Sequence, residues 1–509
     1  MVNKIISGAV DGVEGTLVIV EVDISPGLPG TEIVGLPDSA VREAKERVRA
    51  AIRNSGFKMP SHRITINLAP ASTRKSGASF DLPMAVGILC CMDEIPAERA
   101  RNVFITGELS LDGAIQPVDG VLSMVDNAFN SRIKHFILPY ENGREASLIK
   151  GARVAAIKTL RDLVEFFKTG LLPDYGESAD SFSQEGGAEI LDFSDVKGQE
   201  HVKRALEVAA AGGHNVLMTG PPGSGKTMLA KRVPTILGKL SFTESIEVTK
   251  IYSVAGFTKS TGSLMTERPF RSPHHTSSYS ALTGGGRYPQ PGEISLAHHG
   301  VLFLDEFPEF HKDVREVLRQ PMEDGQVTIS RAAGKVTFPS AFMLICAMNP
   351  CPCGYYGDSG KCTCSSHEVN NYRERVSGPL MDRIDIHVDV PRVELDLLQS
   401  SSKPEGSSQI RDRVIAALDI QKERYAQCPA KVNARMTEPM LEQFCELNPA
   451  GTAMLKKAYE VMNMSARAYH KVLKVARTIA DLDGKEGITE RHLAEALQYR
   501  KMDSRMKYF

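Results

Sequence analysis

One short run has the residue types and spacing that bind phosphate groups. It consists of Gly220, Pro221, Pro222, Gly223, Ser224, Gly225, Lys226 and Thr227, which fit the pattern G-x-x-x-x-G-K-[ST]. Glycines let successive backbone N–H groups turn toward a phosphate, and the start of a helix adds partial positive charge. We therefore predict a nucleotide site in which Lys226 meets the β- and γ-phosphates of ATP and Thr227 binds Mg²⁺. A plain glycine turn is the alternative.

Two apolar runs end in polar side chains that could act on the same nucleotide. Val301 to Leu304 is followed by Asp305 and Glu306, and Phe342 to Met348 is followed by Asn349. An open parallel sheet places its ligands at the carboxyl ends of its strands. We expect Asp305 to hold Mg²⁺, Glu306 to polarise the attacking water and Asn349 to fix that water. A solvated acidic pair and an ordinary turn asparagine are the alternatives.

Four of the nine cysteines crowd together at Cys351, Cys353, Cys362 and Cys364. Four thiolates are the ligand set that a tetrahedral zinc ion takes in structural sites. The single residue between the members of each pair is shorter than the usual spacing, and free thiols or a redox pair are the alternatives. We predict structural Zn²⁺, which would stiffen a long polar loop that has no apolar core.

These candidate sites must be positioned by several segments. Residues 1–170 mix β-branched runs (Thr16–Val22, Arg63–Leu68) with a helical pattern at Ser39–Asn54, which predicts an α+β domain. Apolar strands alternate with helices and glycine loops in the middle of the chain, which predicts a parallel α/β domain. The end of the chain has a helical pattern. The predicted segments are 1–170, a linker at 171–191, an α/β core at 192–393 with a cysteine insertion at 351–364, a linker at 394–408, and helices at 409–509.

The composition excludes several classes of protein. The chain has 509 residues, 61 basic and 62 acidic side chains, and 42% hydrophobic residues, which is typical of a folded protein of several domains. Near-neutral charge does not itself indicate a nucleic-acid partner, so DNA binding would need a local basic surface. No stretch is apolar enough to span a bilayer, and Lys4, Asp11 and Glu14 interrupt the region where a signal peptide would be apolar. We expect a cytoplasmic protein without a membrane partner.

With these motifs in view, the chain resembles the AAA+ ATPases, and within them the magnesium-chelatase-like ComM/YifB family. Further matching segments are Val196 to Gln199, Pro269 to His275, Pro291 to His298, Pro379 to Asp385 and Ala476 to Leu482. The resemblance implies an AAA+ P-loop α/β core, a C-terminal helical lid and a ring, usually hexameric. It also implies that Arg383 reaches the γ-phosphate held by a neighbouring subunit and that Arg467 is the second sensor arginine. A salt bridge from Arg383 to Asp382 or Asp385 is the alternative.

The N-terminal domain resembles the Lon protease domain, which has a ribosomal S5 domain 2-like α+β fold. The resemblance is carried by Arg74 to Ala85, Thr106 to Gly113 and Pro117 to Leu122. Ser79 falls where that family has its nucleophile. A serine needs a base to take its proton, and the position of the activating lysine is occupied here by Leu122. We therefore expect a fold that is retained without proteolysis.

The resemblance implies a DNA motor, with helicase or branch-migration activity in recombination and natural transformation (competence). Residues 325–338 read as a hairpin around Gly334, at the place where related ring helicases point a hairpin into the pore. Arg331 and Lys335 are therefore candidate contacts to branched or duplex DNA, although charged turn residues are by default only solvated. Lys471 and Lys474 read as the solvated face of a lid helix, or else as substitute DNA contacts. A chelatase-type or chaperone-like ATPase that remodels a protein partner is the alternative function.

Overall fold

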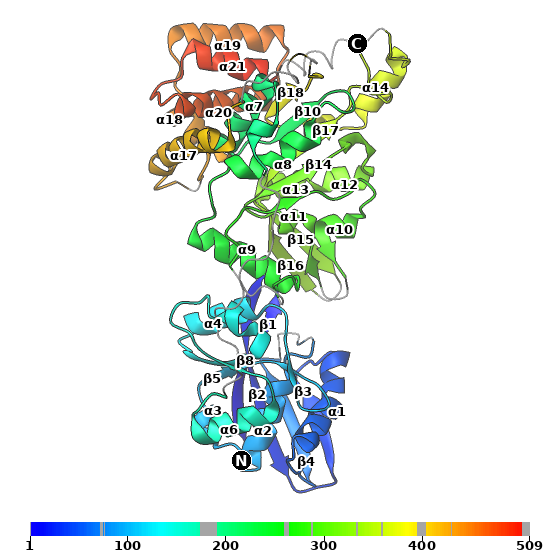
Figure 1. The fold of residues 1–509 in the computed structure, drawn as a ribbon, viewed down its shortest axis with the longest axis vertical. Helices are drawn as coiled ribbons and strands as arrows, with labels where there is room; N and C mark the ends of the chain where they lie inside the picture. Colours follow the sequence, from blue (N-terminus) through cyan, green and yellow to red (C-terminus); the bar gives the residue numbers. More distant parts are fainter. Residues whose placement is uncertain are drawn as a thin grey trace.

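The structure, a computed structural model, runs from an N-terminal domain through a central domain to a helical domain, and Figure 1 shows these three parts along its long axis. It describes residues 2–71, 75, 77–173, 191–258, 264–286, 289–331, 334–357, 360–393, 396, 404–428 and 430–500. The predicted class, a mixed α/β chain of several domains with a helical C-terminal part, is confirmed. In the described residues, no helix is both long and apolar enough to cross a bilayer.

The N-terminal domain is built on a seven-stranded mixed sheet with the order β3-β4-β2-β1-β5-β8-β9. Its strands are β1 (Asn3–Asp11), β2 (Glu14–Ser25), β3 (Gly30–Val34), β4 (Arg63–Ala69), β5 (Val103–Ile105), β8 (His135–Pro139) and β9 (Arg153–Ile157), and β6 (Glu108–Leu109) pairs with β7 (Ile115–Gln116) beside the sheet. Its helices are α1 (Ser39–Asn54), α2 (Asp81–Cys91), α3 (Ala97–Ala100), α4 (Val121–Asn130), α5 (Gly143–Ala146) and α6 (Leu160–Thr169).

Alternation along the strands of this sheet supplies two cores. Val18, Val20 and Val22 of β2 point to one face, where α1, α2 and α6 pack, while Leu17 points to the other face, which α4 covers. The helix expected at Ser39–Asn54 is observed as α1, and its apolar positions are buried as the helical spacing predicts.

The central domain contains a five-stranded sheet in which every strand is parallel, in the order β11-β14-β17-β10-β18. These strands are β11 (Phe270–Arg271), β14 (Val301–Leu304), β17 (Met343–Met348), β10 (Val216–Thr219) and β18 (Ile386–Asp389). The helices around them are α7 (Glu200–Gly212), α8 (Lys226–Ile236), α9 (Phe242–Val254), α10 (Tyr279–Thr283), α11 (Glu293–Leu296), α12 (Lys312–Val317), α13 (Arg319–Asp324), α14 (Ser366–Glu374) and α15 (Gly378–Met381). Two hairpins complete the domain: β12 (Gly284–Gly285) with β13 (Gln290–Pro291), and β15 (Gln326–Arg331) with β16 (Gly334–Pro339).

The helical domain shares one hydrophobic core with the central domain. It consists of α17 (Ser407–Arg424), α18 (Glu438–Phe444), α19 (Pro449–Val461), α20 (Ala466–Leu482) and α21 (Glu490–Gln498). Val472, Val475 and Ile479 of α20 are buried in the same cluster as Val208 of α7 and Val216 of β10. Because this core is continuous, the helical domain is packed firmly against α7 and β10 of the central domain.

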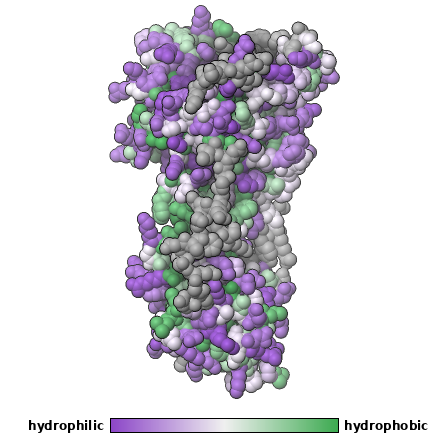
Figure 2. Space-filling view, viewed as in Figure 1, coloured by the Kyte–Doolittle hydropathy of each residue, from purple (hydrophilic) through white to green (hydrophobic). Residues whose placement is uncertain are grey.

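The N-terminal domain docks on α9 and on the β15–β16 hairpin. The ammonium of Lys250 lies 2.7 Å from the carboxylate of Asp126, and the backbone N–H of Gly120 donates to the carbonyl of Ser253 at 3.3 Å. Val13, in the β1–β2 turn, is buried with Val327 of the hairpin. Figure 1 shows the tip of β1 and β2 next to β16, so the two domains meet where the hairpin begins. Figure 2 shows that hydrophilic side chains dominate this face and that hydrophobic ones gather on the left of the narrow middle part.

Candidate active site

The phosphate loop connects β10 to α8, as the sequence predicts. Gly223 and Gly225 have φ angles of +73° and +90°, so each needs the conformational freedom of glycine. The ammonium of Lys226 donates to the carbonyl oxygens of Gly220 at 2.6 Å and Pro221 at 3.0 Å, and to the amide oxygen of Asn349 at 3.3 Å. Burial lowers the pKa of Lys226. The ammonium is therefore held inside the loop, where the oxygens of a phosphate could replace the carbonyl oxygens.

Strand register brings the other predicted residues to the loop. Thr219 of β10 pairs with Met348 of β17, and Cys346 of β17 pairs with Leu304 of β14. The residues that follow these strands therefore share one edge of the sheet. Across this edge the hydroxyl of Thr227 donates to the carboxylate of Asp305 at 2.6 Å. A hydroxyl and a carboxylate are hard oxygen donors of the kind that Mg²⁺ prefers, so these two residues fit the predicted magnesium ligands.

Glu306 has a strained backbone and a partner that the sequence did not indicate. Its φ of +51° lies in the left-handed region, which is uncommon for a residue with a long side chain and is often found at functional sites. Its carboxylate lies 3.1 Å from Nδ1 of His275. His275 therefore contacts the carboxylate that the sequence predicts to act on water. The segment Pro269 to His275 was the only signal that could have pointed to it.

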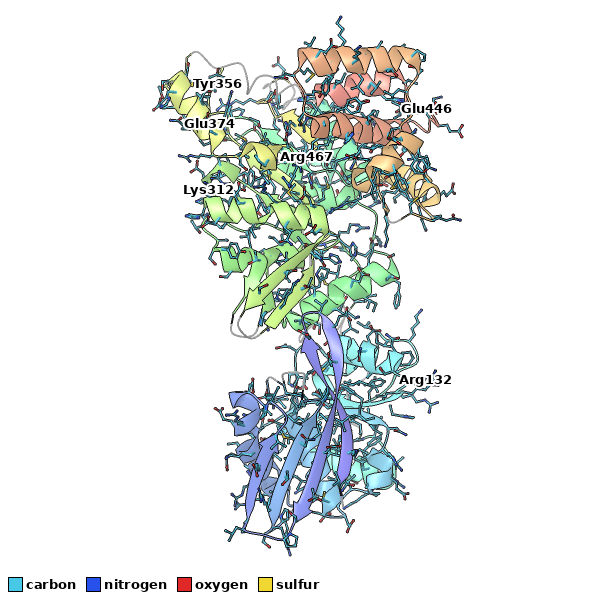
Figure 3. All side chains as sticks on the ribbon, turned by 180° about the vertical axis from the view of Figure 1, so that it is seen from behind. Arg132, Lys312, Tyr356, Glu374, Glu446 and Arg467 are labelled. Carbon is cyan, nitrogen blue, oxygen red and sulfur yellow. The ribbon has the colours of Figure 1, made fainter. Side chains whose placement is uncertain are left out.

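Arg383 and Arg467, the two arginines that the family resemblance assigns to the nucleotide, do not line the phosphate loop of their own chain. Arg383 and Arg467 line a cleft of about 960 Å³ between the central domain and the lid, and no residue of Gly220–Thr227 lines it. Arg383 pairs with Glu323 at 2.6 Å, not with Asp382 or Asp385 as the alternative proposed. Arg467 is exposed, and Figure 3 places it where the lid meets the central domain.

The interpretation of Lys471 as a solvated lid residue is wrong. Its ammonium lies 2.6 Å from the carboxylate of Asp385, and this carboxylate is also 3.4 Å from Nδ1 of His214. Burial alone would raise the pKa of Asp385, but the charge of Lys471 and the hydrogen bond from His214 keep this pKa well below its usual range. Lys474 is half-buried and donates to the carbonyl of Ala434 at 3.1 Å. Helical spacing identified a polar stripe on α20, but Asp385 of the central domain covers Lys471, and Ala434 of the helical domain contacts Lys474.

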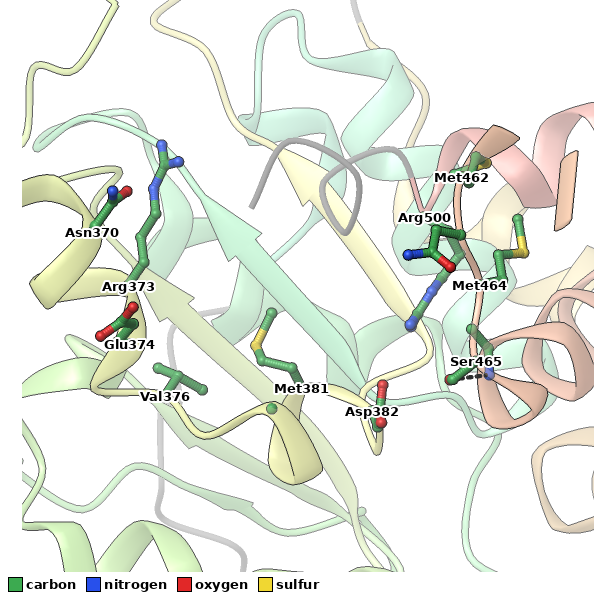
Figure 4. A pocket seen from close by; sticks show the side chains of 13 residues that line it. Asn370, Arg373, Glu374, Val376, Met381, Asp382, Met462, Met464, Ser465 and Arg500 are labelled. Atoms are coloured by element: carbon green, nitrogen blue, oxygen red, sulfur yellow. Dashed lines mark hydrogen bonds between the residues drawn. The ribbon is translucent and has the colours of Figure 1, made fainter. Parts of the chain in front are cut away.

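A smaller cavity of about 340 Å³ lies next to the cleft, and Asp382 lines both. Figure 4 shows Arg373 and Glu374 on one side of it and Met462, Met464 and Arg500 on the other. The guanidinium of Arg500 donates to the carbonyl of Ile384 at 2.7 Å. Arg383 lines the larger cleft but not the smaller cavity.

The four cysteines meet as the sequence predicts. The sulfur of Cys353 lies 3.4 Å from that of Cys351 and 3.7 Å from that of Cys362, and all four sulfurs lie within 4.8 Å of one another. A tetrahedron with Zn–S bonds of about 2.3 Å has edges of about 3.8 Å. N–H groups of Tyr355 and Thr363 lower the pKa of Cys353 to about 6, which favours its thiolate. The ligand number and spacing fit a structural zinc ion.

Glu247, His298 and His299 form a second group with possible metal ligands, but their hydrogen bonds argue against a metal. The backbone N–H of Ala341 donates to Nδ1 of His298 at 2.9 Å, so the proton of the neutral ring is on Nε2. That nitrogen faces the carboxylate of Glu247 at 3.4 Å, and Nε2 of His299 faces it at 2.7 Å. The hydrogen bond from His298 is the main reason why the pKa of Glu247 falls to about 2.

The predicted DNA contacts lie on the β15–β16 hairpin. Lys335 is exposed on β16, where it pairs with Ser330 of β15. Arg331 ends β15, and its side chain lies outside the described residues. One face of the hairpin packs against the rest of the protein, since Val327 and Ile329 are buried. The opposite face carries Ser330 and Lys335, which are both exposed.

The Lon-like domain places no lysine at the position expected to activate Ser79. Leu122, at this position, is fully buried in an apolar cluster with Phe104 and Val118. The nearby Lys75 is also buried, and its ammonium donates to the carbonyl of Pro70. Ser79 itself is half-buried, and its backbone carbonyl accepts from the hydroxyl of Thr106 at 3.1 Å.

Comparison with known proteins agrees with this architecture. The pattern described as "Magnesium chelatase, subunit ChlI" matches residues 192–398, a second ChlI pattern matches residues 20–142, and the ChlI C-terminal pattern matches residues 404–500. The chain is 44% identical to competence protein ComM of Haemophilus influenzae over 96% of both chains, and 42% identical to the uncharacterized protein YifB of Escherichia coli over 97% of this chain and 96% of that one. Lon protease 2 of Bacillus subtilis is 31% identical over 27% of this chain and 26% of its own length. The chain therefore belongs to the ComM/YifB family of magnesium-chelatase-like AAA+ ATPases.

Proposed function

We propose that this protein hydrolyses ATP in a ring and uses the energy to move DNA, with branch migration during recombination and natural transformation as the process served. The observation that carries the ATPase is the meeting of Lys226, Thr227, Asp305 and Asn349 at one sheet edge. Support for the DNA process is the similarity to competence protein ComM along nearly the whole chain.

The residues divide the chemistry between them. Lys226 would bind the β- and γ-phosphates, and Thr227 and Asp305 would hold Mg²⁺, which would neutralise phosphate charge. Glu306 takes a proton from the attacking water and is kept in position by His275. Asn349 orients the same water. This division follows the general scheme of phosphoryl transfer, in which catalysis is mainly positioning and electrostatic stabilisation.

The ring supplies what one chain lacks. Arg383 and Arg467 line a cleft that does not include their own phosphate loop, which supports the proposal that they act on the nucleotide of a neighbouring subunit. Arg383, whose side chain is only 11% exposed, pairs with Glu323, whose side chain is 51% exposed, so the arginine would have to exchange this carboxylate for the phosphate of the neighbouring subunit. An arginine supplied in this way stabilises the charge that develops in the transition state.

The polymer would contact the β15–β16 hairpin, since Lys335 is exposed there while the other face of the hairpin is packed. The alternative function is the remodelling of a protein partner by a chelatase-type motor. It is favoured by the chelatase-subunit patterns that match all three parts of the chain. The two functions differ in the polymer that stimulates ATP hydrolysis.

The ATPase is tested with two variants and a control on the same helix. Lys226→Ala should abolish the binding of a fluorescent ATP analogue, because Lys226 contacts the phosphates of bound ATP. Glu306→Gln should bind the analogue normally but release phosphate slowly, because Glu306 acts on water. Lys231→Ala, an exposed residue of α8, should change neither. Normal phosphate release by Glu306→Gln or Lys226→Ala would refute the assignment of the site.

A further inference from the structure

The four-cysteine loop touches the phosphate loop directly. A Cβ atom placed on Gly354 would lie 2.5 Å from Cδ and 2.7 Å from Cγ of Pro222, and 3.8 Å from Cγ of Asn349. Only a residue without a side chain fits against the proline at the present spacing. The backbone of the cysteine loop at Gly354 therefore packs directly against the ring of Pro222 in the phosphate loop.

The position of Gly354 depends on the cysteines. The N–H of Gly354 donates to the carbonyl of Cys351 at 3.0 Å and closes the turn that contains Cys351 and Cys353. Gly354 has a φ of +85°, as this turn requires. An ion bound by the first two sulfurs would fix the turn, and the turn would then fix the atom that faces Pro222.

The outer part of the loop is tied to the same domain at two further places. The guanidinium of Arg392 lies over the ring of Tyr355, 5.3 Å from its centroid, and that of Arg373 in α14 lies 4.8 Å from the centroid of Tyr356. Both distances are within the range of cation–π pairs. Figure 3 shows Tyr356 at the outer edge of the molecule, beside α14. The neighbour of Arg392, Pro391, accepts from the side-chain N–H of Gln199 at 2.7 Å, and Gln199 also donates to the carbonyl of Ser224 at 2.8 Å.

We propose that the cysteine loop, closed by a metal ion, is a brace that holds the phosphate loop in the shape that binds ATP. The inference rests on the proposed ATPase function and adds positioning roles for Gly354 and Gln199. Gly354 of the cysteine loop packs against Pro222. Gln199 donates to the carbonyls of Ser224 and Pro391, so it links the phosphate loop to the segment that carries Arg392. Loss of the ion would leave a polar loop with little apolar packing, so the phosphate loop would lose its outer support and its affinity for ATP.

The coupling is reciprocal by thermodynamic necessity. If the bound ion raises the affinity for ATP, bound ATP must raise the affinity for the ion by the same factor. At equilibrium with a competing chromophoric chelator, the wild-type chain should therefore retain more zinc with ATP than without it. Free ATP can itself bind zinc, so Lys226→Ala, which should not bind ATP, is the control and should retain the same amount of zinc in both conditions.

Two glycines of the loop supply a matched pair of variants. Gly354 and Gly357 both have positive φ, at +85° and +95°, but a Cβ on Gly357 would meet nothing within 4 Å. The strain of alanine at a positive φ is therefore common to both, and the contact with Pro222 is confined to Gly354. Gly354→Ala should keep one zinc ion per chain and weaken binding of the fluorescent ATP analogue about ten-fold, as overpacking of a tight contact does. Gly357→Ala should keep both zinc and affinity.

The outcomes separate this brace from the ATPase itself. If wild type binds no ATP analogue, the proposed function fails. If wild type binds it and Lys226→Ala does not, but Gly354→Ala binds as well as Gly357→Ala and ATP does not reduce the release of zinc to the chelator at equilibrium, the brace is refuted and the ATPase stands. A wild-type chain that purifies without zinc would also refute the brace. Should Gly354→Ala fail to fold, the release measurement on wild type decides alone.

Discussion

The imidazole of His275 and the carboxylate of Glu306 face each other at 3.1 Å, across the gap between the segment after β11 and the end of β14. Because Glu306 has a left-handed backbone and an exposed side chain, the position of its carboxylate depends on this partner. The neighbouring His274 has a different task, since its Nδ1 lies 2.9 Å from the hydroxyl of Thr276. His275 therefore contacts the candidate active site, whereas His274 contacts the turn at Thr276.

His275→Ala should lower the turnover of ATP and leave its binding unchanged, because the variant loosens the base and does not touch the phosphate loop. The expected loss in kcat is about ten- to a hundred-fold, a part of what a positioned general base contributes. Phosphate release gives kcat, and a fluorescent ATP analogue gives Kd. His274→Ala is the matched comparison: it removes a ring that packs on His275, 4.1 Å between centroids, but leaves the contact with Glu306, so it should lose much less of kcat. Equal losses in both variants would mean that the segment is only structural.

Lys471→Met should destabilise the protein, because it leaves the buried carboxylate of Asp385 without its main counter-charge. Breaking one partner of a buried pair costs about 3–5 kcal/mol. Thermal unfolding measures the effect, and Lys457→Met, an exposed lysine of α19, is the control. If Lys471→Met has a normal Tm but binds DNA more weakly, Lys471 is a surface contact and the buried pair does not form.

Zinc should co-purify at about one ion per chain if the four thiolates close a tetrahedron. Cys362→Ser removes one ligand, so it should lower zinc content and Tm together, whereas Cys428→Ser, a half-buried free cysteine of the lid region, should lower neither through metal loss. Metal analysis and thiol titration of the native protein provide the measurement. Four freely titratable thiols with no metal would rule the site out.

Arg383→Ala should abolish ATP turnover, and mixing this variant with Lys226→Ala subunits should restore part of it. Mixed rings of Arg383→Ala and Lys226→Ala subunits contain interfaces where an intact phosphate loop meets an intact arginine, so part of the activity should return. Glu323→Ala removes the intrachain partner of Arg383 and should keep turnover. If Arg383→Ala retains its ATPase and mixing adds nothing, the arginine serves its own chain.

The site could be predicted from the sequence wherever a local rule applied. The glycine loop has its own pattern, and apolar runs that end in Asp305 and Asn349 meet at one edge because parallel strands share their direction. The contacts that were missed join segments that no local rule connects. His275 and Glu306 follow the neighbouring strands β11 and β14, Gly354 and Pro222 follow the neighbouring strands β17 and β10, and Asp385 covers Lys471 from another domain. Periodicity finds a polar helix face, but it does not show what packs over it.

The rate of ATP hydrolysis with and without forked DNA decides whether hydrolysis at this site drives movement on DNA. At low salt we expect the wild-type rate to rise several-fold with forked DNA, and this rise should weaken as salt is added, as phosphate contacts do. Glu306→Gln should hydrolyse ATP slowly in both conditions. A wild-type protein that hydrolyses ATP at one rate, whatever DNA is added, would rule out the DNA motor and favour a protein partner.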